Sequence, residues 1–126
     1  MIENTNLRIN EKGHLVIGGY DSVELAREFG TPLYVLDEDV IRSNMRMYKN
    51  AMDKYYEGKG LVLYASKALC TMALCRIAQQ EGLGLDVVSG GELYTEMKAG
   101  FPMEKVYFHG NNKSAKELSE ALDAGI

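Results

Sequence analysis

Lys67 is the residue of this sequence whose position most favours chemistry. It lies in the segment "LYASKAL", directly after the apolar residues 61–65, "LVLYA". An amine at the end of a buried strand is desolvated, and desolvation favours its neutral form. A neutral lysine amine can attack an aldehyde and form a Schiff base. Position alone leaves a solvated loop lysine as the alternative.

Asp86 is the second candidate, because it interrupts the apolar residues 85–88, "LDVV". A charge within a buried strand needs a partner, and Lys67, one predicted strand earlier, is the predicted partner. The alternative is a carboxylate at a strand end that caps a nearby loop.

Other polar residues also follow predicted strands, where parallel α/β folds bind their ligands. They are Asp37, Ser66, Ser89 and His109. His109, in "FHGNN", can donate to a ligand or stack beside it, and a purely structural histidine is the alternative.

The segment "DVVSGGE" places two glycines after a strand, where backbone N–H groups can approach an anion. It matches neither the P-loop nor the GxGxxG pattern. Ser89 and Glu92 fit a helix capping box better than a phosphate site.

The two cysteines are predicted to be small core residues. Cys70 and Cys75 lie five positions apart within a helical pattern, which points them to different faces of the helix. Their spacing fits neither CxxC redox chemistry nor a zinc finger. The sequence therefore predicts no metal site.

Composition excludes several classes of protein. The 126 residues carry a net charge of -4, are 46% hydrophobic and 25% charged, and contain no basic run, which argues against nucleic acid as a partner. No apolar run approaches the roughly 20 residues of a membrane-spanning helix. The polar start lacks the apolar stretch of a signal peptide, so a cytoplasmic location is expected.

The elements that position these residues alternate between strand and helix. Four apolar runs of strand length each precede a helical pattern; they are residues 32–36, 61–65, 85–88 and 106–108. Asp37 is a predicted N-cap, Ser114 with Glu117 a second capping box, and Gly82, Gly100 and Gly125 are helix ends. This order predicts an α/β fold with a parallel sheet and right-handed crossovers.

Upstream, residues 15–17 are expected to form a short strand and residues 21–29 a helix. We therefore predict a leader of residues 1–30 and an α/β region of residues 31–126. Four parallel strands do not close a barrel, which takes eight. The region is either an open sheet or part of something longer.

Four segments, in this order, resemble the amino-terminal part of the diaminopimelate decarboxylase family: "TPLYVLDEDVIRSN", "YASKAL", "EGLGLDVVSGGEL" and "VYFHGNNKSAKEL". That family belongs to the pyridoxal-phosphate-dependent decarboxylases built on an alanine-racemase-like barrel. The resemblance implies about four βα units of a (β/α)8 TIM barrel, preceded by a short strand and helix. The second half of the barrel and a β domain would be absent.

The resemblance also implies a function. Lys67 would be the Schiff-base lysine and catalytic residue, and Asp86 and His109 would join it in binding pyridoxal 5'-phosphate (PLP). The full-length enzyme would convert meso-2,6-diaminopimelate to L-lysine, while these residues alone would be inactive.

Two alternatives remain open at this point. One is another PLP-dependent decarboxylase of the same family, although "HGNNKS" favours the diaminopimelate branch over ornithine decarboxylase, which typically has an Asn-Pro pair there. The other is a receiver-type signalling domain, suggested by "VLDED". Such domains carry their strand-end lysine in the fifth βα unit, whereas Lys67 follows the second predicted strand.

A half-barrel leaves strand edges without neighbours, at residues 33–36 and 106–108. Exposed edges of this kind recruit other strands. We therefore expect a homodimer or a larger assembly.

Overall fold

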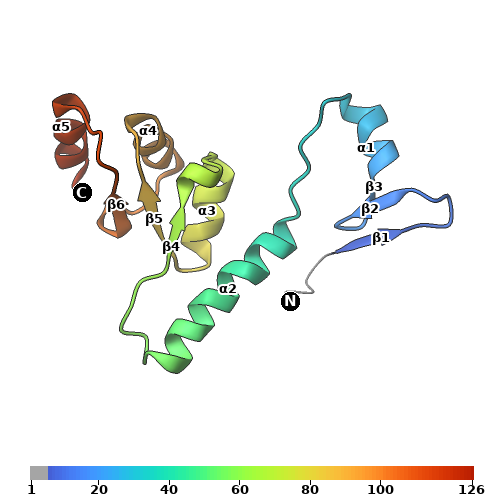
Figure 1. The fold of residues 1–126 in the computed structure, drawn as a ribbon, viewed down its shortest axis with the longest axis horizontal. Coiled ribbons are helices and arrows are strands. Elements are labelled where there is room, and N and C mark those ends of the chain that lie inside the picture. Colours follow the sequence, from blue (N-terminus) through green and yellow to red (C-terminus); the bar gives the residue numbers. More distant parts are fainter. Residues whose placement is uncertain (1–5) are drawn as a thin grey trace. The chain divides into compact units, whose positions relative to one another are not determined.

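The structure, a computed structural model, describes residues 6–126 and has a mixed α/β fold. It divides into two compact units, one ending at Asn44 and one comprising Met45–Ile126, and helix α2 runs across the division (Figure 1). Each unit is described by itself. The predicted boundary at residue 30 stays a prediction.

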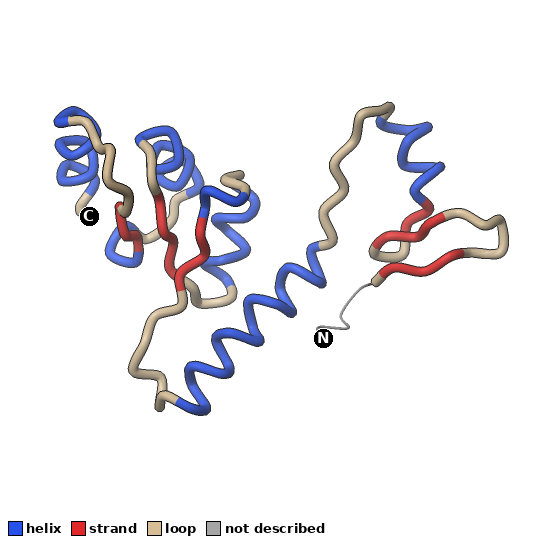
Figure 2. Tube along the Cα trace, viewed as in Figure 1, coloured by secondary structure: helices blue, strands red, loops and turns tan. Residues whose placement is uncertain are grey.

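The first unit contains a small antiparallel sheet and one helix. Strands β1 (Leu7–Ile9), β2 (Leu15–Ile17) and β3 (Tyr20–Asp21) pair in the order β1-β2-β3, and helix α1 (Ser22–Phe29) follows directly (Figure 2). The predicted strand at residues 15–17 and the predicted helix are confirmed. β1 and β3 were not predicted, because each is short and largely exposed.

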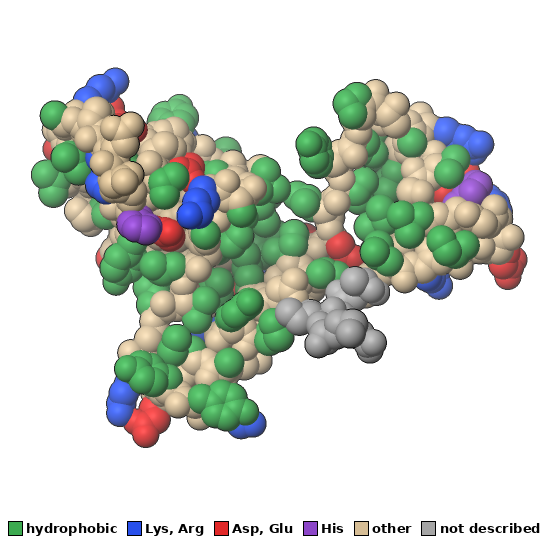
Figure 3. Space-filling view, viewed as in Figure 1, with side chains coloured by type: hydrophobic (Ala, Val, Ile, Leu, Met, Phe, Trp, Pro, Cys, Tyr) green, Lys and Arg blue, Asp and Glu red, His purple; other side chains and the backbone are tan. Residues whose placement is uncertain are grey.

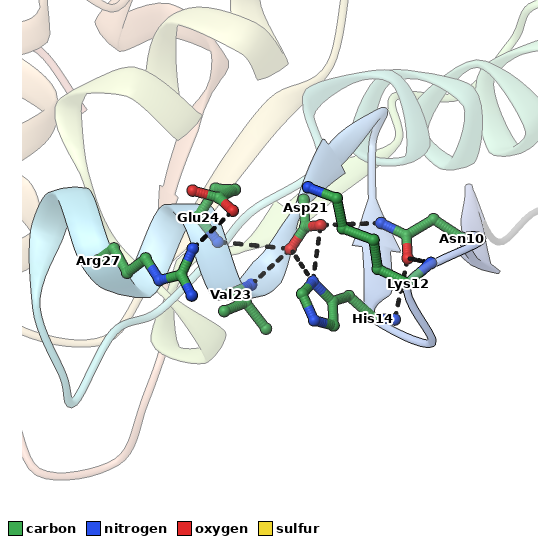
Figure 4. Close-up of polar contacts among 7 residues, drawn as sticks. All are labelled: Asn10, Lys12, His14, Asp21, Val23, Glu24 and Arg27. Carbon is green, nitrogen blue, oxygen red and sulfur yellow. Dashed lines mark hydrogen bonds and ion pairs between the residues drawn. The ribbon is translucent and has the colours of Figure 1, made fainter.

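Asp21 joins the sheet of this unit to α1 (Figure 4). Its carboxylate accepts hydrogen bonds from Val23 N at 2.8 Å and Asn10 Nδ2 at 2.8 Å, and its Oδ2 lies 2.9 Å from His14 Nδ1. Burial acts to raise the pKa of Asp21, but the hydrogen bonds from His14 and Asn10 outweigh it and lower that pKa to about 2. His14 and Asp21 therefore form a structural pair at the start of α1.

The predicted strand at residues 32–36 is wrong. These residues form no strand, and Tyr34 is 97% exposed. A strand needs a neighbouring backbone with which to exchange hydrogen bonds. Within residues 6–126, no strand pairs with this segment. Its apolar composition was therefore not sufficient to make it a strand.

Helix α2 (Glu38–Tyr55) begins where the sequence predicted. Asp37 Oδ1 accepts a hydrogen bond from Val40 N at 3.1 Å, so Asp37 acts as its N-cap. In the second unit, Arg46 donates to both carboxylate oxygens of Glu81, at 2.6 and 2.8 Å. This bidentate pair holds the helix against the end of α3.

The second unit is a three-stranded parallel sheet with a helix after each strand. Its strands pair in the order β4-β5-β6, with Ala65 opposite Asp86 and Asp86 opposite Tyr107. The elements are β4 (Leu63–Ala65), the 3-10 turn η1 (Ser66–Ala68), α3 (Met72–Gln80), β5 (Gly84–Val87), α4 (Gly90–Ala99), the 3-10 turn η2 (Met103–Lys105), β6 (Val106–Phe108) and α5 (Ala115–Ala124). Three of the four predicted strands are thus confirmed, with ends that differ by at most two residues.

The core of this unit lies on one face of the sheet. Leu85 and Val87 are fully buried there, together with Leu93 of α4, while Asp86 and Tyr107 point to the opposite face. Apolar side chains also reach the surface of both units (Figure 3). The face opposite the core therefore carries Asp86, flanked by Ala65 and Tyr107.

The ends of the helices follow the predicted chemistry. Ser114 and Glu117 form a complete capping box at the start of α5. Gly100 and Gly125 adopt left-handed conformations at the ends of α4 and α5. Among residues 6–126, no helix has the length and apolar character needed to cross a membrane.

Candidate functional site

The carboxyl ends of β4, β5 and β6 gather the predicted site residues at one edge of the sheet. Ala65 of β4 lies opposite Asp86 of β5, and η1 begins at the next residue. Lys67 therefore follows β4 directly, as predicted. His109 follows β6, and its backbone N–H donates to the Val87 carbonyl at 2.8 Å.

Asp86 has a different partner from the one predicted. Its Oδ2 lies 3.7 Å from His109 Nδ1, and the exposed fractions of the two side chains are 21% and 73%. The predicted pair with Lys67 is not formed; instead, the loop after β6 brings His109 to the Asp86 side of the sheet edge. Sequence reasoning named both residues but missed their contact.

The Lys67 amine is available for reaction. The side chain is exposed, and its Nζ makes neither a hydrogen bond nor an ion pair with any of residues 6–126. Ser66, the residue before Lys67, is by contrast buried, with only 1% of its surface exposed. The desolvation expected for Lys67 is therefore not found: its side chain is exposed, next to the buried Ser66.

Glu92 is the residue that anchors the Lys67 turn. Ser66 Oγ lies 2.9 Å from Glu92 Oε1 and 2.9 Å from the Asp86 carbonyl oxygen. The other carboxylate oxygen of Glu92 accepts from Ser89 Oγ at 2.7 Å and from Val88 N at 3.1 Å. One side chain therefore connects η1, the end of β5 and the start of α4.

These contacts set the ionisation of Glu92. Burial acts to raise its pKa, but the hydrogen bonds from Ser89, Ser66 and Val88 outweigh burial and lower it. Glu92 is thus favoured as a charged acceptor. Sequence reasoning found its capping position and missed its link to Ser66, which lies 26 residues away.

The predicted capping box at Ser89 is only half formed. Ser89 Oγ accepts from Glu92 N at 3.4 Å, while the Glu92 carboxylate accepts from Val88 N at 3.1 Å. Gly90 N donates to Glu117 Oε1 at 3.0 Å. The N–H that the "SGGE" segment offered to an anion is therefore taken by a carboxylate of the next helix.

The prediction that Cys70 and Cys75 point apart is wrong. Thr71 caps α3, with its Oγ1 accepting from Leu74 N at 3.2 Å, and the helix begins at Met72. Cys70 therefore precedes the helix and turns back toward Cys75. The two Sγ atoms and a carboxylate oxygen of Glu96 all lie within 4.8 Å of one another.

Burial governs the chemistry of this second cluster. It raises the pKa of Cys75 to about 12, with the nearby Cys70 and Glu96 adding to the shift. Burial, with the charges of Glu92 and Asp86, raises the pKa of Glu96 to about 8.

Comparison with known proteins places the chain in a family. Residues 38–126 match the model of the pyridoxal-dependent decarboxylases, pyridoxal binding domain. The diaminopimelate decarboxylase of Bacillus methanolicus is 57% identical over 119 residues, covering 94% of this chain and 27% of that protein. The diaminopimelate decarboxylase of Bacillus subtilis is 52% identical over 122 residues, with the same coverage. The chain thus spans about a quarter of the length of these relatives.

Solved structures of the same family resemble this chain. The crystal structure of diaminopimelate decarboxylase from M. jannaschii in co-complex with L-lysine has a TM-score of 0.89 and 40% identity, covering 100% of this chain and 30% of that one. The lysine/ornithine decarboxylase of Vibrio vulnificus complexed with cadaverine has a TM-score of 0.71 and 30% identity, covering 82% and 27%. The predicted resemblance is confirmed: the chain belongs to the pyridoxal-dependent decarboxylase family and carries its pyridoxal-binding domain over residues 38–126.

Proposed function

We propose that the full-length protein containing this chain is a PLP-dependent diaminopimelate decarboxylase that forms L-lysine from meso-2,6-diaminopimelate. The observation that carries the proposal is the position of Lys67, an exposed amine at the carboxyl end of β4 that has no polar partner among residues 6–126. The choice of substrate rests on 57% and 52% identity to two diaminopimelate decarboxylases. The lysine/ornithine decarboxylase is less similar, at 30%.

The residues at the sheet edge fit PLP. An aldehyde requires an accessible primary amine, and Lys67 supplies one. The Asp86 and His109 side chains lie beside each other at the next two strand ends, 3.7 Å apart, where they can bind and orient the cofactor. We therefore assign cofactor binding to Lys67, Asp86 and His109.

PLP, when bound, supplies an electron sink for the bond-breaking step. The contribution of this chain is to hold and orient it. Lys67 anchors the cofactor, and its Nζ can accept or return a proton at the reacting centre. Ser66 and Glu92 fix the turn that carries Lys67, because a misplaced reacting group loses rate steeply.

We also propose the barrel architecture, the location and the oligomeric state of the full-length protein. The βα units of this chain form the first half of a (β/α)8 barrel in the full-length protein. Residues 1–30 form the leader and residues 31–126 the half-barrel. The full-length enzyme is a cytoplasmic homodimer, and the 126 residues alone do not turn over substrate.

Covalent trapping tests the role of Lys67. The full-length protein is loaded with PLP, reduced with borohydride and digested, and the labelled peptide is sequenced by mass spectrometry. We expect the label on Lys67 and release of lysine and carbon dioxide from meso-2,6-diaminopimelate. Lys67→Arg keeps the charge and is expected to lower kcat by at least about 100-fold, whereas Lys98→Arg on the surface of α4 is the matched control.

The outcomes separate the two parts of the proposal. A label on another lysine would overturn the assignment of Lys67. A label on Lys67 with turnover of ornithine but not of diaminopimelate would keep the cofactor site and overturn the substrate.

A further inference from the structure

Three side chains with metal-binding atoms meet behind the sheet, on elements that the proposed reaction does not use. Cys70 lies just before α3, Cys75 lies within α3, and Glu96 lies within α4. Their two Sγ atoms and one carboxylate oxygen are all within 4.8 Å of one another. Both cysteines are free thiols.

Glu96 is the member of this cluster that most requires a partner. Its side chain is fully buried, and neither carboxylate oxygen receives a hydrogen bond from any of residues 6–126. Buried polar groups are nearly always hydrogen-bonded, and a buried charge is normally paired or bound to a metal. A buried, unpartnered carboxyl group that faces two thiols is therefore a candidate ligand for a cation.

Access and packing also suit an ion at this place. Cys75 is 2% exposed, while Cys70 is only partly buried, so the cluster is closed on the protein side and reachable from solvent past Cys70. α3 and α4 pack against each other. An ion bound by residues of both helices would link α3 to α4.

We propose that Cys70, Cys75 and Glu96 bind one Zn²⁺ ion, with a water molecule in the fourth position. Thiolate sulfur and carboxylate oxygen are both common zinc ligands, at about 2.3 Å and about 2.0–2.2 Å. In a tetrahedron these bond lengths separate the donor atoms by roughly 3.5–3.8 Å. The cluster reaches this geometry through small side-chain rotations.

Binding of the ion releases protons from its ligands. The two thiols and the Glu96 carboxyl group lose their protons to solvent when they bind the ion. Three negative ligands and one divalent ion leave a single net negative charge, in place of a buried carboxyl group with no partner. The ion therefore has a structural role between α3 and α4.

Cobalt substitution tests this site in the full-length protein, purified with a reductant and stripped with a chelator. Co²⁺ bound by two thiolates gives intense sulfur-to-metal charge-transfer bands, and Zn²⁺ should displace it at one equivalent per chain. Cys70→Ser and Cys75→Ser should each remove part of these bands, and Glu96→Gln should weaken Zn²⁺ binding by at least about 10-fold. Glu104→Gln, an exposed carboxamide substitution on η2, is the control.

The partly exposed position of Cys70 keeps the test decisive, because Cys70→Ser should fold even where the buried substitutions do not; circular dichroism verifies this. Charge-transfer bands that survive unchanged in Cys70→Ser would overturn the proposal. So would a reduced protein that binds less than about a tenth of an equivalent of either metal, or Glu96→Gln and Glu104→Gln proteins of equal affinity. The proposal would also be contradicted if the reduced protein takes up no metal and, on reoxidation, the two cysteines form a disulfide.

Discussion

At the scale of single residues, the candidate site depends on the half-buried carboxylate of Glu92 as much as on the Lys67 amine. Glu92 gathers Ser66, Ser89 and the Val88 N–H, while Lys67 makes no polar contact of its own within residues 6–126. The orientation of Lys67 therefore depends on the turn that Glu92 holds in place. In the proposed function, this division leaves the amine free for the cofactor.

Replacing Glu92 should loosen that turn. Glu92→Ala leaves the partly buried Val88 N–H without its carboxylate acceptor, and we expect a loss of about 1–3 kcal/mol in the free energy of unfolding. Glu92→Gln should lose much less, because an amide oxygen still accepts from Val88 and Ser66 can accept from the amide nitrogen. Urea denaturation of the full-length protein measures both, with Lys98→Ala on the exposed side of α4 as control. Equal stability of the alanine and control variants would contradict this role.

The sequence located Lys67, Asp86 and His109 because strand ends are visible as breaks in an apolar pattern. It could not show which of them touch. The Ser66–Glu92 contact spans 26 positions, and the Asp86–His109 contact depends on how β5 and β6 align. Contacts of this kind follow from sheet register, which a single sequence does not reveal.

At the scale of elements, helices and strands differ in how far local patterns determine them. The helices were predictable because their caps and periodicity lie within each segment, as at Ser114 and Glu117. Residues 32–36 are as apolar as β4 but form no strand, because a strand is completed by its neighbour. The prediction that Cys70 and Cys75 point to different faces of one helix failed for a local reason. Thr71 is the N-cap of α3, so the helix begins after Cys70.

Gly84 shows how closely two of these elements pack. A Cβ at this position would lie 2.4 Å from the Lys105 carbonyl oxygen and 2.6 Å from Leu63 Cδ2. Gly84→Ala should therefore push β5 away from the backbone before β6, and destabilise the fold by about 1–3 kcal/mol.

Gly91 provides the matched control for Gly84→Ala. A Cβ on Gly91, in the first turn of α4, meets no atom closer than Ser89 Oγ at 4.0 Å. Gly91→Ala should leave stability unchanged or raise it by up to about 1 kcal/mol, because alanine favours the helix. Thermal or urea unfolding compares the two variants, and a neutral Gly84→Ala would show that the strand can shift without loss.

At the scale of the whole molecule, the parallel sheet of residues 6–126 ends in two open edges. β4 and β6 each pair only with β5 among the strands described here. In a closed barrel both would have a second neighbour. The chain also exposes large apolar side chains, among them Leu122 at 73% and Tyr107 at 54%. Open edges and exposed apolar side chains are features that drive association.

The 126-residue chain by itself should therefore self-associate at micromolar concentration. Burying an exposed leucine or tyrosine contributes about 1.5–3 kcal/mol, so several together offset the roughly 4–15 kcal/mol that association costs. Light scattering coupled to size-exclusion chromatography should show dimers or larger species, and Leu122→Lys should shift the distribution toward monomer by removing one exposed apolar side chain from α5. The full-length protein, whose remaining strands would cover both edges, serves as the comparison. A stable monomer of the short chain that unfolds cooperatively would show that its three βα units close their own core.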